Sequence, residues 1–321
     1  MFWASSCGGC EISLVNLHEK ILEVDRHFDF FFCPCLLDTK RADLEALDDG
    51  AIAITFFNGA IRNSENREMA HLLRRKSQLL IAYGSCSAAG SIPALSNLSG
   101  KAEHIRTNYL EGVSLDNPQG VLPQTSSFTA EGEVDLPEFY ETVQTLAQTV
   151  EVDYFLPGCP PEPHQIWGVA EAVIEGRPLP PRHSTLGAGR STVCDECGKH
   201  KSNKRIARFH RTYEVIPDAR QCLLEQGLIC MGIATRDGCG ALCPAVNMPC
   251  TGCYGPPAGV ADQGAKMLAA LGSILDLGEY KGMSERQVAE KADAILAAIP
   301  DLAGTFYKYS LAGSVLERRA Q

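Results

Sequence analysis

Fourteen cysteines in a chain of 321 residues are the side chains best able to do chemistry. In chain order, twelve of them form three sets of four: Cys7, Cys10, Cys86 and Cys159; Cys194, Cys197, Cys222 and Cys230; and Cys239, Cys243, Cys250 and Cys253. Four thiolates hold a [4Fe–4S] cluster, and four thiolates also hold a structural zinc ion. The spacing therefore predicts three metal centres and leaves iron and zinc both open.

The scatter of the first set favours iron. Structural zinc sites usually draw their ligands from two close pairs, whereas Cys86 and Cys159 are single residues that follow separate apolar runs. The third set is compact and surrounded by glycine, as in ferredoxin-type cluster loops. Because three iron–sulfur centres in one chain suggest a path for electrons, we expect electron transfer. A zinc-stabilised scaffold without a redox role is the alternative.

Composition limits the other classes of function. The net charge of −10 disfavours general nucleic-acid binding. No apolar run reaches the roughly 18 residues of a membrane span. No signal peptide or twin-arginine leader is visible, so we expect a cytoplasmic protein in which disulfides are rare.

Short apolar runs alternate with helical patterns in the first half of the chain. Residues 27–35, 51–57, 78–86 and 152–160 are predicted strands, and residues 11–24, 64–77, 137–150 and 162–176 are predicted helices. This alternation predicts an α/β fold with a parallel sheet covered on both faces. Cys86 and Cys159 end two of the predicted strands, and Cys7 and Cys10 follow a possible short strand at residues 1–5. We therefore expect the first set to meet beyond the carboxyl ends of the strands.

The second half has a different character. Residues 1–176 are predicted to form the first domain, residues 177–190 a Pro- and Gly-rich linker, and residues 191–321 a second domain. Residues 191–258 carry eight cysteines and show little hydrophobic periodicity outside residues 203–216. We therefore expect bound metal, rather than an apolar core, to stabilise this segment. Residues 260–277 and 284–299 are predicted helices that cap this domain.

Three further features allow two interpretations each. Cys33 and Cys35 are either ordinary buried thiols or a redox-active or extra-ligand pair, and neither is assigned a role. Glu11 favours the start of a helix electrostatically, with a role in proton transfer as the alternative. A basic segment is either a solvated surface or a docking site for an electron acceptor; it comprises Lys199, His200, Lys201, Lys204, Arg205, Arg208, His210 and Arg211.

Three motifs together resemble the small subunits of [NiFe] hydrogenases. They are Cys7-Gly8-Gly9-Cys10, "AYGSC" ending at Cys86, and "PGCPPEP" around Cys159. The eight later cysteines match the further cluster ligands of that family in order, so the resemblance covers residues 1 to about 260. The stretch "FFNGAIRNSENREMAHLLRRKS" is similar to the cytoplasmic, methyl-viologen- or F420-linked branch. Within that branch, the gamma subunit of F420-non-reducing hydrogenase, which works with heterodisulfide reductase, is the nearest likeness.

The resemblance implies a flavodoxin-like first domain, an irregular iron–sulfur domain and three [4Fe–4S] clusters. The first set would hold the proximal cluster, Cys239, Cys243, Cys250 and Cys253 the medial cluster, and Cys194, Cys197, Cys222 and Cys230 the distal cluster. A separate large subunit would hold the NiFe centre and split H2, with no catalytic residue in this chain apart from a possible proton relay through Glu11. Electrons would leave through an iron–sulfur or flavin partner, such as the heterodisulfide reductase complex.

Two departures from the family pattern affect the later sets. Cys194 stands where many members have histidine, so the distal set is all thiolate. Cys243 stands where many members have proline and a three-iron medial cluster, so we predict a four-iron cluster. The small subunit of an F420-reducing or NAD-linked hydrogenase and a complex-I-like cluster subunit are the alternatives. The latter normally has adjacent cysteines where this chain has Cys7 and Cys10.

Overall fold

The computed structural model describes residues 1–278, 282–299 and 301–316. It has two compact units: Met1–Leu186 together with Leu311–Gln321, and Gly187–Ser310. The segment 177–190, expected as a linker, is part of the first unit up to Leu186. Its short strand β9 (Ser184–Thr185) pairs with the sheet of that unit, and the Leu186 side chain is buried.

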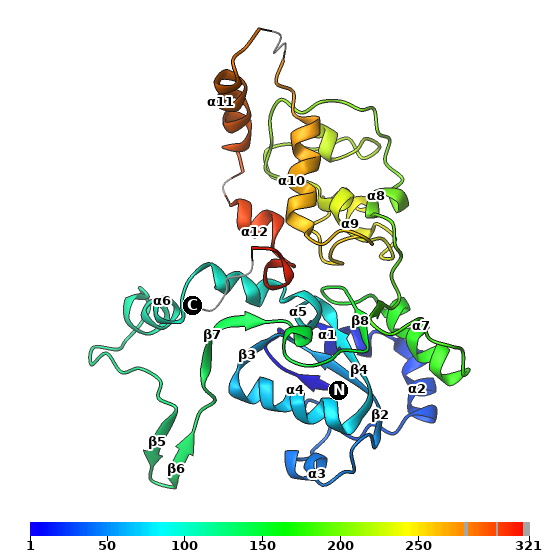
Figure 1. Ribbon diagram of the computed structural model, residues 1–321, viewed down its shortest axis with the longest axis vertical. Helices are drawn as coiled ribbons and strands as arrows, with labels where there is room; N and C mark the ends of the chain where they lie inside the picture. The colour runs from blue at the N-terminus through cyan, green and yellow to red at the C-terminus, as the bar shows by residue number, and fades with distance from the viewer. Residues whose placement is uncertain (279–281, 300, 317–321) are drawn as a thin grey trace. The chain divides into compact units, whose positions relative to one another are not determined.

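The first unit is built on a five-stranded parallel sheet in the order β1-β2-β4-β8-β9 (Figure 1). The strands before β9 are β1 (Phe2–Trp3), β2 (Ile52–Asn58), β4 (Ser77–Tyr83) and β8 (Tyr154–Leu156). Consecutive residues of β4 enter opposite cores. Leu80 and Ala82 pack in one apolar cluster, and Ile81 and Tyr83 pack in the other. Burial on both faces explains why the sheet strands read as continuous apolar runs, and the predicted α/β class is confirmed.

Helices cover both faces of this sheet. They are α1 (Gly9–Val15), α2 (Ile21–His27), α3 (Arg41–Glu45), α4 (Ser64–Lys76), α5 (Gly84–Ala89) and α7 (Pro163–Ile174). Helix α6 (Lys101–Arg106) has no buried residue and lies apart from this sheet (Figure 1). The Asn63 side chain accepts a 2.8 Å hydrogen bond from the Asn66 N–H and so caps α4, whose last turn is basic. Residues 11–24, expected as one helix, form α1 and α2 with a break at His18, which has a φ of 54°.

Two predicted elements of the first unit are wrong. Residues 137–150, expected as a helix, contain strand β7 (Phe139–Gln144), which pairs antiparallel with β3 (Ile61–Asn63). Aromatic and β-branched residues favour a strand there once β3 offers a partner. Residues 27–35, expected as a strand, are irregular after His27. The Met1 nitrogen donates a 2.5 Å hydrogen bond to the Phe32 carbonyl, but β1 is too short to offer a longer ladder.

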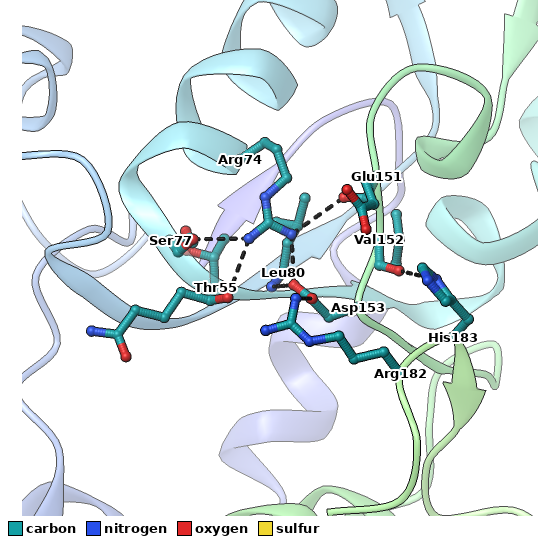
Figure 2. Close-up of polar contacts among 10 residues, drawn as sticks. Thr55, Arg74, Ser77, Leu80, Glu151, Val152, Asp153, Arg182 and His183 are labelled. Carbon is teal, nitrogen blue, oxygen red and sulfur yellow. Dashed lines mark hydrogen bonds and ion pairs between the residues drawn. The ribbon is translucent and has the colours of Figure 1, made fainter.

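A buried carboxylate joins several elements of the first unit (Figure 2). Asp153, next to β8, has a side chain only 1% exposed. It accepts hydrogen bonds from Arg74 Nη1 at 2.6 Å and from the Leu80 N–H at 2.7 Å, and it pairs with Arg182. Burial alone would raise the pKa of Asp153, but these hydrogen bonds and the two guanidinium groups hold it below its usual value. Asp153 therefore ties α4, β4 and the segment before β9 to one point.

The second unit contains little regular structure around its cysteines. Its helices are α8 (Val193–Glu196), α9 (Leu242–Ala245), α10 (Gln263–Ile274), α11 (Glu285–Leu296) and α12 (Leu302–Phe306). The predicted helices at 260–277 and 284–299 are therefore confirmed. Residues 203–216 are irregular, with single bridges from Ile206 to Leu275 and from His210 to Leu228. Within the described ranges, no helix combines the length and apolar character that a bilayer crossing needs.

A two-stranded hairpin lies apart from the main sheet. Strands β5 (Ser126–Thr129) and β6 (Gly132–Asp135) pair with each other, and all eight of their residues are exposed. Figure 1 shows the hairpin at the end of an extended segment of the first unit. An isolated hairpin is only marginally stable in water, so the cysteine chemistry does not depend on it.

Candidate metal centres

The first cysteine set gathers where three segments of the first unit meet. Cys86 lies in α5 directly after β4, and Cys159 lies three residues after β8. The Ser85 N–H donates to the Gly158 carbonyl at 2.8 Å, which joins these two loops. The Tyr83 hydroxyl donates to the Cys10 carbonyl at 2.9 Å, which joins β4 to α1. The carboxyl ends of parallel strands thus bring cysteines from distant positions to one edge of the sheet.

Burial and neighbouring thiols raise the pKa values of Cys10, Cys86 and Cys159. Burial, followed by the nearby Cys86, Glu11, Cys159 and Cys7, raises the pKa of Cys10. Burial raises the pKa of Cys86 to about 12, and Cys159 and Cys7 add to this rise. Burial and Cys7 raise the pKa of Cys159. Four thiolates at such a place need a compensating cation, and a coordinated metal supplies one.

The described surroundings of the first set contain buried polar atoms without partners. In the described part of the chain, Glu11 Oε2, Asn58 Oδ1 and Ser87 Oγ are buried without a hydrogen-bond partner. Buried polar atoms are rarely left unpaired, so these three mark an incomplete polar environment. These observations fit a metal–sulfur group held by Cys7, Cys10, Cys86 and Cys159.

Gly84 has the closest steric relation to a ligand of this set. Its φ is 81°, and a Cβ added there would overlap Cys10 Sγ. We expect Gly84→Ala to displace Cys10 and to lower the iron content of the purified protein. The left-handed φ adds a backbone cost of about 1–2 kcal/mol. Iron analysis and thermal unfolding measure both effects.

Gly168→Ala is the matched control for this substitution. Gly168 lies inside α7, and a Cβ there would meet no atom within 4 Å. We expect this variant to keep its iron and to gain about 0.5–1 kcal/mol of stability, because alanine favours a helix interior. Equal iron content in the two variants would contradict the role given to Gly84.

The second set lines a cavity of the second unit. Cys194, Cys197, Cys222 and Cys230 all border a volume of about 390 Å³. The Cys197 N–H donates to the Val193 carbonyl, and the Cys222 N–H donates to the His200 carbonyl at 2.8 Å. Burial raises the pKa of Cys194 to about 12, and the nearby Cys230 adds to this effect. The four cysteines thus border one common cavity.

Part of the basic segment belongs to this cavity. Lys199, Lys201, Lys204 and Arg205 line it together with the cysteines. Lys201 Nζ donates to the Cys194 carbonyl at 2.6 Å, and its charge opposes the rise in the pKa of Cys194. Lysine charges beside four thiolates stabilise their ionised form. From the sequence, the basic segment is expected to be a solvated surface or a docking surface. The sequence does not predict that these side chains lie beside the cysteines.

The third set is a neighbour of the second. The Cys250 N–H donates to Cys230 Sγ at 3.3 Å. Burial raises the pKa of Cys250, with Cys230 as the next largest cause and Cys253 as a smaller one. Burial also raises the pKa of Cys239, and the nearby Cys243 contributes. The second and third sets are therefore in contact through Cys230 and Cys250.

Within the described residues, no three His, Cys, Asp or Glu side chains are arranged as the ligands of a single metal ion.

Glu11 is held in place by a residue that the sequence did not single out. Asn58, at the end of β2, donates hydrogen bonds to Glu11 Oε1 at 2.6 Å and to Ser6 Oγ at 3.2 Å. Glu11 also lies in the first turn of α1, where a carboxylate favours the helix. Both interpretations of Glu11 are compatible with this position.

Comparisons with known proteins place these sets in a family. Residues 7–173, which contain the first set, match the family described as "NADH ubiquinone oxidoreductase, 20 Kd subunit". The F420-non-reducing hydrogenase iron-sulfur subunit of Archaeoglobus profundus is 37% identical over 319 residues, which are 98% of this chain and 95% of the relative. The F420-non-reducing hydrogenase vhu subunit of Methanocaldococcus jannaschii is 33% identical over 321 residues, covering 100% of this chain and 97% of the relative.

A more distant relative covers about half of the chain. The NAD-reducing hydrogenase HoxS subunit delta of Cupriavidus necator is 26% identical over 174 residues, which are 54% of this chain and 76% of the relative. The longer matches, in contrast, run through both units and all three cysteine sets. The chain therefore belongs to the NADH ubiquinone oxidoreductase 20 Kd subunit family and, within it, with the iron–sulfur subunits of F420-non-reducing hydrogenases, and it is a subunit of an oxidoreductase.

Proposed function

We propose that the chain is the electron-transferring small subunit, or gamma subunit, of a cytoplasmic [NiFe] hydrogenase. The observation that carries this proposal is the grouping of the cysteines. The first set meets at the carboxyl edge of the sheet, and two further sets touch in the second unit. Relatives that match this chain over nearly its whole length are named as hydrogenase subunits.

Each set holds one [4Fe–4S] cluster in this proposal. Cys7, Cys10, Cys86 and Cys159 hold the proximal cluster, which faces the NiFe centre of a separate large subunit. The third set holds the medial cluster and the second set the distal cluster. Thiolate ligation by four cysteines is the usual way to hold a cubane that carries single electrons. The contact between Cys230 and Cys250 supports direct transfer between the last two clusters.

We propose the electron acceptor from the family resemblance and from charge. The chain groups with subunits of F420-non-reducing hydrogenases, and its resemblance to the gamma subunit of that branch implies an iron–sulfur or flavin partner, such as the heterodisulfide reductase complex. Lys204 and Arg205 line the cavity of the second set and carry positive charge that would attract an acidic partner. An NAD-linked assembly is the second candidate, because the Cupriavidus necator relative is named as NAD-reducing.

A complex-I-like role is the remaining alternative. The family match ends at residue 173, before the eight later cysteines. Relatives named as hydrogenase subunits, however, match this chain through those cysteines. This difference in coverage favours the hydrogenase assignment.

The test is reduction by hydrogen in the complex. The chain is purified anaerobically with its partner subunits, and H2 is added while visible absorption is followed. The proposal predicts that H2 bleaches a broad iron–sulfur absorption and that methyl viologen added under H2 is reduced to its blue radical. Co-purifying subunits then identify the acceptor. Absorption that does not change under H2, in a complex that contains nickel, would contradict the proposed electron path.

Cys243 gives a prediction about the medial cluster. Because a fourth thiolate completes a cubane, we expect redox titration followed by EPR to show no three-iron signal in the undamaged protein. Cys243→Ala should create such a signal. The neighbouring Leu242→Ala, at a side chain that is 48% exposed, is the control and should leave the spectrum unchanged. A three-iron signal in the unaltered protein would count against four-iron ligation.

A further inference from the structure

Two cysteines outside the three sets lie in contact with each other. Cys33 Sγ and Cys35 Sγ are 3.4 Å apart. They belong to the irregular segment after α2 and flank Pro34 in a turn. None of the proposed cluster sites uses them, so their juxtaposition needs its own explanation.

The backbone holds the two thiols at this spacing. The Leu36 and Leu37 N–H groups both donate to the Cys33 carbonyl at 2.8 Å, which closes the turn. Pro34 restricts its own φ and leaves the turn few alternatives. A further hydrogen bond spans the pair, because the Thr39 hydroxyl donates to the Phe31 carbonyl at 2.7 Å. The pair is therefore fixed by hydrogen bonds on both sides.

The two thiols differ in exposure. Cys33 is 2% exposed, whereas Cys35 is open to solvent. Burial, and then the hydrogen bond with Cys35, raises the pKa of Cys33 to about 11. A reagent in solution thus reaches the exposed Cys35 first. Cys33 is buried next to Cys35 and is a protonated thiol at neutral pH.

We propose that Cys33 and Cys35 form a thiol–disulfide exchange site for low-molecular-weight disulfides, separate from the metal centres. The exposed Cys35 receives the reagent, and the buried Cys33 resolves the mixed disulfide. A side-chain rotation must shorten the sulfur–sulfur distance from 3.4 Å to the bonded length of about 2.05 Å. Exposed Cys35 has room for that rotation.

The exchange is balanced in atoms and electrons. The Cys35 thiolate attacks one sulfur of the disulfide, forms a mixed disulfide and releases one thiolate, which takes up the proton that Cys35 lost. Cys33 then loses its proton and attacks Cys35 Sγ. The bond between Cys33 and Cys35 forms as the second small thiol leaves with that proton. Two protein thiols are oxidised and one external disulfide is reduced to two thiols, a transfer of two electrons and two protons.

The redox state of Cys33 and Cys35 can be measured separately from that of the other twelve cysteines. Trypsin cleaves after Arg26 and after Lys40, so one peptide carries Cys33 and Cys35 and no other cysteine. The intact complex is incubated anaerobically with oxidised glutathione, its free thiols are alkylated, and this peptide is analysed by mass spectrometry. We expect the doubly alkylated peptide to be lost and replaced by an unalkylated peptide that lacks two hydrogen atoms. Dithiothreitol should restore double alkylation.

Two variants separate the roles of the thiols. Cys33→Ser should keep a glutathione adduct on Cys35, because no second thiol resolves it. Cys35→Ser should give neither an adduct nor a disulfide, because Cys33 is buried. Iron content and circular dichroism equal to those of the unaltered complex establish that each variant is folded. Double alkylation of the unaltered peptide after incubation, or an adduct on Cys33 in Cys35→Ser, would overturn the proposal.

Discussion

Replacing Cys86 with serine is expected to remove the proximal cluster and to abolish H2-dependent reduction of methyl viologen. Cys86 lies in α5, which follows β4 directly, and the nearby Cys159 and Cys7 are themselves proposed ligands that cannot take its place. A serine hydroxyl is a poor ligand for iron in a thiolate cage. The substitution should lower the iron content by about four per chain, the content of one cubane.

Cys35→Ser is the matched control for iron content in this experiment. Cys35 is also a cysteine of the first unit, but it lies outside the three sets, and its thiol contacts Cys33. Iron per chain in this variant should equal that of the unaltered protein. Full iron content and full H2-dependent activity in Cys86→Ser would show that Cys86 is not a ligand.

Replacing Asp153 with alanine is expected to give the largest loss of stability of any single polar substitution in the first unit. The substitution leaves the buried Leu80 N–H without its side-chain acceptor and deprives Arg74 of its carboxylate partner, so that Arg74 keeps only backbone carbonyl acceptors such as that of Ser77. Breaking a buried ion pair costs about 3–5 kcal/mol. The loss of unfolding free energy for Asp153→Ala should lie near the lower end of this range, at about 3 kcal/mol. The reason is that the Arg182 side chain is 57% exposed and can be hydrated by water once its partner is gone. Chemical denaturation of the purified complex measures the change.

An exposed ion pair provides the comparison. Glu45 pairs with Arg41 in α3, and both side chains are about half exposed. Glu45→Ala should change stability by less than about 1 kcal/mol, as is usual for surface pairs. If Asp153→Ala destabilised the protein no more than Glu45→Ala, the account of Asp153 as a buried anchor would be wrong.

The contribution of the Asp153 carboxylate to folding stability depends on pH. The folded-state pKa of Asp153 is held below its unfolded value, so its contribution is fully present at neutral pH. The contribution declines as the pH falls below the ordinary aspartate pKa of about 3.9. The stability difference between the unaltered protein and Asp153→Ala should therefore shrink in acid.

The sequence was sufficient for features that depend on local pattern. Buried parallel strands appear as apolar runs, so β2, β4 and β8 were expected near their observed places. Asn63 and the basic last turn mark α4 in the same way. The chain order of the cysteines predicts three sets of four, since a [4Fe–4S] cluster takes four thiolate ligands. The edge of the sheet at which the first set meets follows from strand direction alone.

Features that depend on distant partners could not be read from the sequence. Strand β7 exists because β3, more than seventy residues earlier, offers a pairing edge. The contact of Cys250 with Cys230 crosses twenty residues of irregular chain. Lys201 folds back on the Cys194 carbonyl, and no periodic pattern predicts that contact. In each case a contact between residues distant in the sequence, rather than the local pattern, determined the structure.

The measurement that tests the central claim most directly is Mössbauer spectroscopy, with parallel zinc analysis, on the complex of this chain with its large subunit alone, purified anaerobically from cells grown on labelled iron. If the three cysteine sets each hold a cubane, about twelve iron atoms per copy of this chain should show [4Fe–4S] signals, four for each cluster. Zinc should be absent at stoichiometric level. Zinc bound in place of iron, or cubane iron amounting to only one cluster, would contradict an electron path through this chain.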